Sequence, residues 1–240
     1  MEPRLFWQEL NTRIAKYDLL CHPFYQAWTM GQLTHDDLRA YAADYYHHVA
    51  AFPEYLRIFE ERLNPAEGGP AVREMAEAVS QNRGDEEGAG SPDGRSHAEL
   101  WLDFAEGMGA NRTMVKGHRP VAEVCELIST FEKIAEEGTP AEALAAFYAY
   151  ESQVPRVARE KAAGLLSRYG ADTKACHYFI LHTTADVHHS QVWRDLLEQQ
   201  ISAAGEGCAT RALDAAEETA QALWRALDGI ERDRQTRMAA

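Results

Sequence analysis

The chain has 240 residues and a formal net charge of −14, from 24 basic and 38 acidic side chains. We do not expect so acidic a chain to bind nucleic acid or an anionic membrane surface, because their phosphates would repel it. No apolar run approaches the length of a membrane span, and the opening MEPRLFWQEL lacks the apolar stretch of a secretory signal. The four cysteines form no CxxC pair, so we expect reduced thiols in a cytoplasmic protein.

Helical periodicity runs through nearly the whole chain, because apolar residues recur three and four positions apart. Alternating strand patterns and hairpin turn signals are missing. We therefore expect an all-α protein, with residues 1–228 forming a single helical domain and residues 229–240 a polar, disordered tail. The predicted helices cover residues 4–18, 22–30, 35–63, 70–85, 97–108, 121–137, 140–168, 172–202 and 208–230.

The segment 84–96, GDEEGAGSPDGRS, is the part of the chain least suited to a helix. It is rich in glycine and charge and contains Pro92. It is followed by a helix start, because Ser96 and Glu99 form a capping-box pattern. We interpret the segment as a mobile loop inside the domain.

The stretch HTTADVHH, residues 182–189, concentrates side chains that bind metals. His182, Asp186 and His189 stand at positions i, i+4 and i+7, which places them within about 60° of one another around a continuous helix. His188 points away from this stripe, and we expect it to face solvent or to be paired. Such a stripe is more often a hydrogen-bonded network or a surface face, so spacing alone leaves both interpretations open.

Other helices offer the partners that a metal site inside a helical bundle needs. Glu151 lies in the apolar, aromatic stretch YAYES, His97 opens a helix, and Glu86 or Glu87 precedes it. Each has an ordinary alternative, as a salt-bridge partner, a helix-start residue or a solvated loop charge. Histidine and carboxylate ligands suit iron and manganese, whereas the absence of cysteine ligands argues against an iron–sulfur cluster.

Several tyrosines lie in apolar helical surroundings, where core packing is the ordinary interpretation and oxidation by a nearby metal the functional one. Lys161 is by default an exposed helix lysine. On one continuous helix it would lie about −80° around and about 15 Å along the axis from Glu151, so it would not share the face of Glu151. The tyrosines are Tyr25, Tyr41, Tyr45, Tyr46, Tyr148 and Tyr150.

Four segments, taken in order, resemble the CADD family (Chlamydia protein associating with death domains) over about residues 5–225. They are FYQAW, GQLTHDDLRAYAADYYHHVAAFPEYL, YAYESQVPRVAREK and HTTADVHH. The resemblance implies a heme-oxygenase-like seven-helix bundle, related in fold to TenA and PqqC proteins. It also implies a dinuclear metal centre of two irons, or of manganese and iron. The family's ligand pattern falls on Glu86, His97, Glu151, His182, Asp186 and His189.

The resemblance further implies an activity, the synthesis of para-aminobenzoate for folate without the chorismate route, with the protein as its own substrate. Among the implied catalytic residues, Tyr25 matches the tyrosine that supplies the ring and Lys161 the lysine that supplies the amino nitrogen. Tyr41 matches a further tyrosine near the site. Dioxygen and an external reductant would be co-substrates, and a homodimer and an electron donor are implied as partners. The spacing between the first glutamate and the first histidine is longer here than in the family, so Glu86 and Glu87 remain alternatives.

Other functions stay open at this point. A multiple-turnover oxygenase of the same fold would act on an external fatty acid or amino acid and would keep Tyr25 intact. A protein-interaction module is the alternative from another class, although no exposed apolar motif supports it. A metal-free thiaminase or cofactorless oxidase is disfavoured by the full ligand set.

Overall fold

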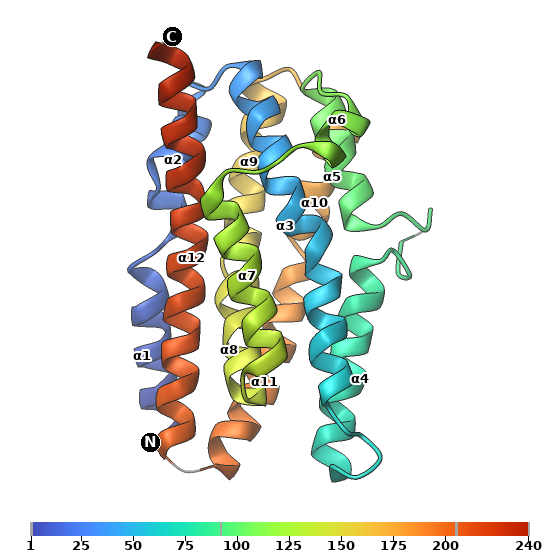
Figure 1. Ribbon diagram of the computed structural model, residues 1–240, viewed down its shortest axis with the longest axis vertical. Helices are drawn as coiled ribbons and strands as arrows, with labels where there is room; N and C mark the ends of the chain where they lie inside the picture. The colour runs from blue at the N-terminus through green and yellow to red at the C-terminus, as the bar shows by residue number, and fades with distance from the viewer. Residues whose placement is uncertain (1, 92, 205, 240) are drawn as a thin grey trace.

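The protein is helical throughout the part of the chain that the structure describes. The structure is a computed structural model that describes residues 2–91, 93–204 and 206–239. Pro92 of the predicted loop, Ala240 of the predicted tail, and Met1 and Gly205 of the predicted domain lie outside these residues. The described residues contain no strand, which confirms the all-α class (Figure 1).

The bounds of the helices follow the predicted periodicity in most places, and the nine predicted helices correspond to twelve α-helical segments within the described residues. The helices are α1 (Pro3–Ala15), the short 3-10 helix η1 (Leu19–Cys21), α2 (Pro23–Met30), α3 (His35–Arg62), α4 (Gly69–Glu86), α5 (His97–Gly107), α6 (Arg112–Gly117), α7 (Ala122–Glu137), α8 (Pro140–Glu151), α9 (Val154–Arg168), α10 (Thr173–His182), α11 (Ala185–Ala203) and α12 (Glu206–Ala239).

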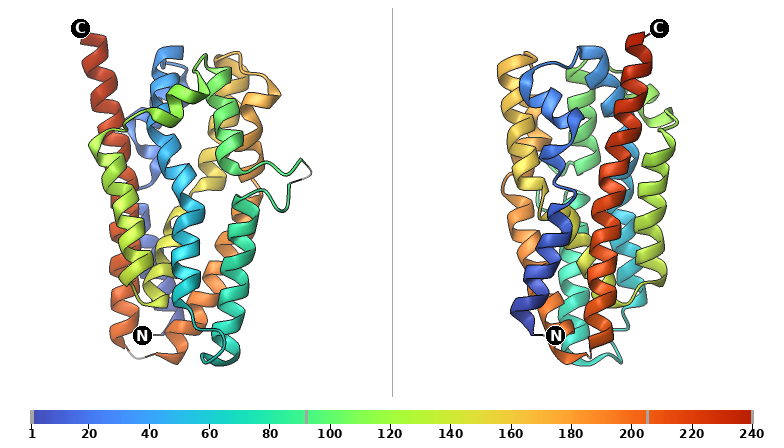
Figure 2. Two further views of the ribbon diagram at one scale, coloured as in Figure 1. Left: turned by 45° about the vertical axis from the view of Figure 1, so that its right-hand side comes forward. Right: turned by 90° about the vertical axis from the view of Figure 1, so that its left-hand side faces the viewer.

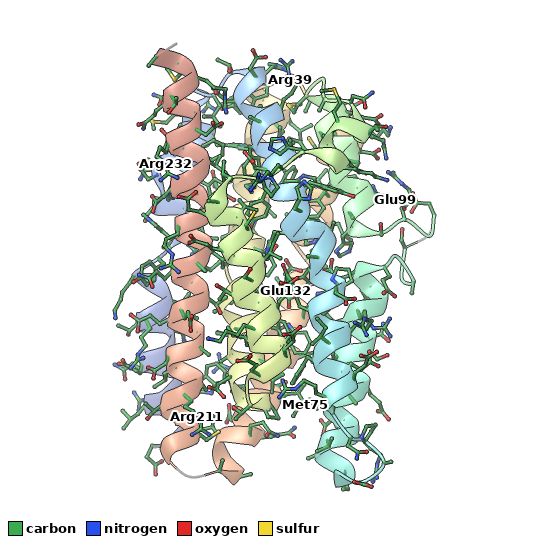
Figure 3. The ribbon with its side chains drawn as sticks, viewed as in Figure 1. Arg39, Met75, Glu99, Glu132, Arg211 and Arg232 are labelled. Atoms are coloured by element: carbon green, nitrogen blue, oxygen red, sulfur yellow. The ribbon has the colours of Figure 1, made fainter. Side chains whose placement is uncertain are left out.

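The long helices run side by side and form a bundle (Figure 2). α12 lies along one side against α7 and α8, while α11 packs on α8, and α10 on α5 and α9. The interior is dense in aromatic rings, and Trp28, Trp101 and Trp193 are among its largest buried side chains. Charged side chains such as Arg211 and Arg232 of α12 lie on the outside (Figure 3). Across the described residues, no helix combines the length and the apolar character that a membrane span requires.

The helix predicted over residues 140–168 is broken in the structure. α8 ends at Glu151 and α9 begins at Val154, with Pro155 in its first turn. Proline lacks a backbone N–H and clashes with the preceding turn, so the helical hydrogen-bond ladder is interrupted here. The prediction that Glu151 and Lys161 share one helix is therefore wrong, and the angular offset derived from it does not apply.

The helix predicted over residues 172–202 is also broken, at Thr183 and Thr184. α10 ends at His182 and α11 begins at Ala185. The hydroxyls of both threonines donate hydrogen bonds to backbone carbonyls three residues earlier, which offers the backbone an alternative to a continuous helix. The expectation of one uninterrupted stripe through HTTADVHH is therefore wrong, because its first histidine closes one helix and the other two residues lie on the next.

The remaining differences concern helix ends. Gly84, Asp85 and Glu86 belong to the last turn of α4, so the segment predicted as a loop begins later than expected. The short helix α6 was not predicted. Residues 229–239, expected to be disordered, continue α12, and their basic side chains explain the difference. Arg234 and Arg237 lie 4.0 Å and 3.6 Å from carboxylate oxygens of the buried Asp37 at the start of α3.

Candidate metal centre

The structure brings the six predicted metal-binding side chains together inside the bundle, and all six are buried. Most of them lie at helix ends, so the interruptions between α8 and α9 and between α10 and α11 help to bring them together. We call this group the carboxylate–histidine cluster. It consists of Glu86 at the end of α4, His97 at the start of α5, Glu151 at the end of α8, His182 at the end of α10, and Asp186 and His189 in the first turns of α11.

Two groups of three residues within this cluster could each hold a cation. Glu86, His97 and His182 place ligand atoms within 4.8 Å of one another, and so do Glu86, Glu151 and His189. Glu86 belongs to both groups. Since a carboxylate has two oxygens, it can bind one cation with each, and the arrangement therefore suits two neighbouring metal ions.

The alternative ligand Glu87 lies elsewhere. Its side chain is exposed and forms a salt bridge of 3.1 Å with Arg83, one turn earlier on α4. His188 is exposed as well, as its position in the sequence predicts. The geometry therefore favours Glu86 over Glu87 as the residue that faces the cluster.

Two imidazole nitrogens in the cluster are buried without a properly directed hydrogen bond. His97 Nδ1 lies 2.7 Å from Glu86 Oε2, yet it has no hydrogen-bond partner among the described residues. His189 Nδ1 lies 3.5 Å from Asp186 Oδ1 and 4.0 Å from Glu151 Oε1, and it also makes none. Buried polar atoms are nearly always satisfied. Nitrogen and oxygen atoms that converge without hydrogen bonding to each other are suited to sharing a cation.

The outer nitrogens of two histidines are held by other groups. His182 Nδ1–H donates to the backbone carbonyl of Tyr178 at 2.6 Å, so Nε2 is the nitrogen left to bind a metal. His189 Nε2 lies 3.3 Å from Asp85 Oδ2, which leaves Nδ1 facing the cluster. Such outer contacts fix the ring orientation and the tautomer of metal-binding histidines.

The charges of the cluster also fit a cation. Burial raises the pKa of Glu151 well above its ordinary value, despite the opposing charge of His189. Burial alone would raise the pKa of Glu86, but the nearby histidines, His97 first, outweigh it and hold that pKa below its ordinary value. Burial alone would lower the pKa of His189, but Asp186 and the two glutamates outweigh it and raise it to about 10. Protons thus offset the carboxylates, and divalent cations would replace them.

Two residues that position Glu151 were missed by the sequence analysis. Trp193 Nε1–H donates to Glu151 Oε2, and Asn82 Nδ2 lies 3.5 Å from Glu151 Oε1. Asn82 stands four residues before Glu86 on α4, and Trp193 four residues after His189 on α11. Helical spacing from the predicted ligands was therefore a usable signal for both.

A second buried group, the tyrosine–lysine cluster, consists of Tyr25 on α2, Tyr41 on α3 and Lys161 on α9. Lys161 Nζ lies 2.8 Å from Tyr25 Oη and also hydrogen bonds to Tyr41, and the two phenolic oxygens are 3.1 Å apart. The amine is 4.2 Å from the centre of the Tyr25 ring. Lys161 is therefore not the exposed helix lysine of the ordinary interpretation.

Burial favours the neutral form of each side chain in the tyrosine–lysine cluster. Burial lowers the pKa of the Lys161 amine well below its ordinary value, and no carboxylate among the described residues forms an ion pair with it. Burial raises the pKa of the Tyr25 and Tyr41 hydroxyls well above their ordinary value. The amine thus keeps its lone pair, and both phenols keep their protons.

Tyr150 and Tyr178 separate the two clusters. Both rings line a cavity of about 20 Å³ on the side of Lys161 and Tyr25, and both line another of about 10 Å³ on the side of Glu86. Each cavity has room for about one water molecule. The space between the clusters is therefore filled by the side chains of the protein itself.

The solved structures define the fold class. A domain with a heme oxygenase-like fold from Shewanella denitrificans aligns with a TM-score of 0.79 at 17% identity, over 98% of this chain and 94% of that chain. The heme-oxygenase-like bundle that the sequence resemblance implied is confirmed.

The family is defined by the sequence. The model of a family described as iron-containing redox enzyme matches residues 39–224. A 4-aminobenzoate synthase from Chlamydia trachomatis serovar D is 34% identical over 226 residues, which cover 94% of this chain and 91% of that protein. A 4-aminobenzoate synthase from Nitrosomonas europaea is 33% identical over 96% of this chain and 92% of that protein. The chain therefore belongs to the family of iron-containing redox enzymes, and the predicted family resemblance is confirmed.

Proposed function

We propose that this protein is a 4-aminobenzoate (para-aminobenzoate) synthase that consumes its own Tyr25 and Lys161. The relatives named for that activity support the proposal. The single observation that carries it is the position of Lys161 Nζ, a buried amine 2.8 Å from the phenolic oxygen of Tyr25.

The chemistry of the product gives this contact its meaning. 4-Aminobenzoate carries a nitrogen and a carboxylate at opposite positions of a benzene ring, where a tyrosine side chain carries an oxygen and a methylene group. The conversion forms a bond from the ring to nitrogen, breaks the Cε–Nζ bond of the lysine and releases the phenolic oxygen as water. The methylene carbon is separated from Cα and oxidised to a carboxylate, with dioxygen as the oxidant. Nitrogen must therefore arrive at the phenolic end of the ring, which is where Lys161 Nζ lies.

The residues of the tyrosine–lysine cluster prepare this exchange. Burial lowers the pKa of Lys161 well below its ordinary value, and the resulting neutral amine can act as a nucleophile. The Tyr41 hydroxyl contacts both reacting groups and holds them in register. Trp28 and Phe24 pack against the Tyr41 ring and help to exclude water.

The carboxylate–histidine cluster is the place for the oxidising cofactor. A bound pair of irons, or of manganese and iron, would supply the oxidising chemistry with dioxygen and an external reductant. The residues that would hold it are Glu86, His97, Glu151, His182, Asp186 and His189, and Trp193 and Asn82 would orient Glu151.

The competing function, a multiple-turnover oxygenase for a fatty acid or an amino acid, receives less support. The cavities on either side of Tyr150 and Tyr178 hold about 20 Å³ and about 10 Å³. These two cavities leave no room for an external substrate between the clusters, which supports a substrate that is part of the chain. We further propose that the product enters folate synthesis without the chorismate route.

The proposal is tested by loading the protein anaerobically with ferrous iron, alone or with manganese, and then adding reductant and oxygen. We expect 4-aminobenzoate by mass spectrometry and a matching loss of mass from the chain. Tyr25→Phe should bind metal normally and release no product, whereas Tyr46→Phe, at a partly exposed tyrosine of α3, should behave like the wild type. Product from Tyr25→Phe would contradict the proposal.

A further inference from the structure

A cavity of about 260 Å³ opens beside the carboxylate–histidine cluster, on the side away from the tyrosine–lysine cluster. It lies between the segment after α4, the start of α5, and the facing ends of α10 and α11. In Figure 3, Glu99 marks the start of α5 beside that segment. The lining includes His97 and His189, one residue from each of the two groups that could hold a cation.

Metal-binding side chains continue from this cavity into the cluster. His177 and His188, which also line it, are exposed. Asp85 is 28% exposed and lies 3.3 Å from His189 Nε2, and His189 is 6% exposed and lies 4.0 Å from Glu151, which is 1% exposed. Asp85, His189 and Glu151 therefore form a row of donors from a partly exposed carboxylate to a buried one, and His177 and His188 line the cavity outside it.

The carboxylate of Asp85 lines the cavity next to His189 and stays uncovered on one side. Gln81 Nε2 donates to Asp85 Oδ1 at 3.2 Å, while Oδ2 faces His189. A Cβ atom at Gly90 would lie 2.9 Å from Asp85 Oδ1, so the glycine keeps this side of the carboxylate uncovered. Oxygen and imidazole donors of this kind can replace the water molecules of a divalent cation one at a time.

The charges around the cavity permit a cation to approach. Arg95 lines the cavity, but its guanidinium is paired with the buried carboxylate of Asp103 at 2.7 Å. The chain as a whole carries a net charge of −14. Acidic surfaces raise the local concentration of cations and their association rate.

We propose that this cavity is the port through which divalent metal ions enter and leave the carboxylate–histidine cluster, with Asp85 and the exposed His177 and His188 passing each ion to His189. The inference rests on the proposed metal-dependent function and adds a route of loading to it. A port acts on rates in both directions, whereas a residue that only orients His189 acts on affinity. The two roles can therefore be separated by experiment.

The test uses the full-length apo-protein and Co²⁺ alone as the probe, whose visible absorption changes on binding nitrogen and oxygen donors. Asp85→Asn keeps an oxygen that can accept from His189 and removes the charge, and a second variant combines His177→Gln with His188→Gln. We expect both variants to slow uptake by about tenfold, the low end of the effect of a charged cleft, and the double histidine variant to slow release into a chelator equally. The final content of two ions per chain and the affinity should be unchanged in the double histidine variant, whereas Asp85→Asn also removes the charge that orients His189.

Matched controls separate the port from changes in overall charge. Two control variants should load at the wild-type rate. They are Asp195→Asn, at an exposed aspartate two turns after His188 on α11, and His35→Gln, at an exposed histidine of α3. Wild-type loading rates in the port variants would overturn the proposal. Weaker affinity with faster release in the double histidine variant would overturn it too, since His177 and His188 would then only help to hold the bound ions.

Two further outcomes are distinct. A variant that loads metal normally but no longer accepts electrons from a small reductant would show that the cavity serves the reductant, and would overturn the port. Wild-type protein that binds no Co²⁺, Fe²⁺ or Mn²⁺ would overturn the metal-dependent function together with the port. If the wild type binds metal and the port variants load it at the wild-type rate, the port alone would be overturned.

Discussion

The carboxylate–histidine cluster and the tyrosine–lysine cluster are buried in the same bundle, but they differ in how their charges are compensated. In the first, Glu151 and Glu86 face imidazoles, and the pKa of His189 is raised to about 10 by its carboxylate neighbours after burial is overcome. In the second, the Lys161 amine hydrogen bonds to two phenolic oxygens and lies beside aromatic rings, no ion pair joins it to a carboxylate among the described residues, and burial lowers its pKa well below the ordinary value.

The comparison shows how one interior can support two kinds of chemistry. Burial disfavours charge in both clusters, and the presence or absence of an opposite charge decides the outcome. In the first cluster the imidazoles favour the charged form of Glu86, although burial disfavours that of Glu151, whereas burial in the second favours a neutral nucleophile beside a neutral phenol. Tyr150 and Tyr178 stand between them, so neither cluster supplies the other with a counter-charge by direct contact.

The largest expected effect comes from breaking the first cluster. His182→Ala or Asp186→Ala should reduce the metal content of anaerobically loaded protein from two ions to one or none, and should abolish the product. Both side chains are buried. His182 belongs to one of the two groups that share Glu86, and Asp186 Oδ1 lies 3.5 Å from His189 Nδ1 of the other. Elemental analysis measures the content, with His35→Ala as an exposed control. Two tightly held ions in either variant would show that these residues are not ligands.

The second prediction concerns a permanent positive charge introduced into the tyrosine–lysine cluster. Lys161→Arg should keep the metals and lose the product, and it should destabilise the fold by about 3–5 kcal/mol, the usual cost of an uncompensated buried charge. Lys161→Met should also lose the product, yet match or exceed the wild type in stability, because it removes a buried polar group. Urea denaturation and product analysis are the measurements. Full activity in Lys161→Ala would remove the lysine from the mechanism.

A smaller effect concerns His48, a buried histidine without a salt bridge to a carboxylate among the described residues, in contrast to His189. His48 is fully buried among aromatic rings, its ring nitrogens have no hydrogen-bond partner in the described part of the chain, and burial lowers its pKa to about 3. Its ordinary pKa is 6.5. As the pH falls below that value, the unfolded chain gains a proton that the native histidine does not, so the free energy of unfolding decreases until about pH 3.

His48→Phe should remove this contribution. The difference in unfolding free energy between the variant and the wild type should grow in favour of the variant by about 1.4 kcal/mol for each pH unit below 6.5. Above that pH the difference should be constant, because the histidine is neutral in both states. Denaturation curves at a series of pH values measure it, and parallel stability profiles would show that His48 is charged or compensated in the native state.

The sequence predicted the helical class and the membership of the carboxylate–histidine cluster, and it left open how the members meet. Periodicity placed His182, Asp186 and His189 on one continuous helix, whereas the threonine pair breaks it. The three side chains still converge, because the change of direction between α10 and α11 points His182 toward Asp186 and His189.

The tyrosine–lysine cluster was harder to predict from the sequence. A continuous helix would have turned Lys161 away from Glu151, and the break before Pro155 removes that constraint. The contact between Lys161 and Tyr25 joins α9 to α2, residues far apart in the chain, and no local pattern encodes such packing. Only the family resemblance gave the two residues a joint role, and the structure places them within hydrogen-bond distance.

The most direct test of the self-consuming reaction follows the atoms of Tyr25 and Lys161 into the product. Protein made with ring-labelled tyrosine and with lysine carrying heavy nitrogen at Nζ would be loaded with metal and treated with reductant and oxygen. We predict 4-aminobenzoate that carries both labels, in no more than one equivalent per chain. Unlabelled product formed from an added small molecule, with the mass of the chain unchanged over repeated turnovers, would contradict the account.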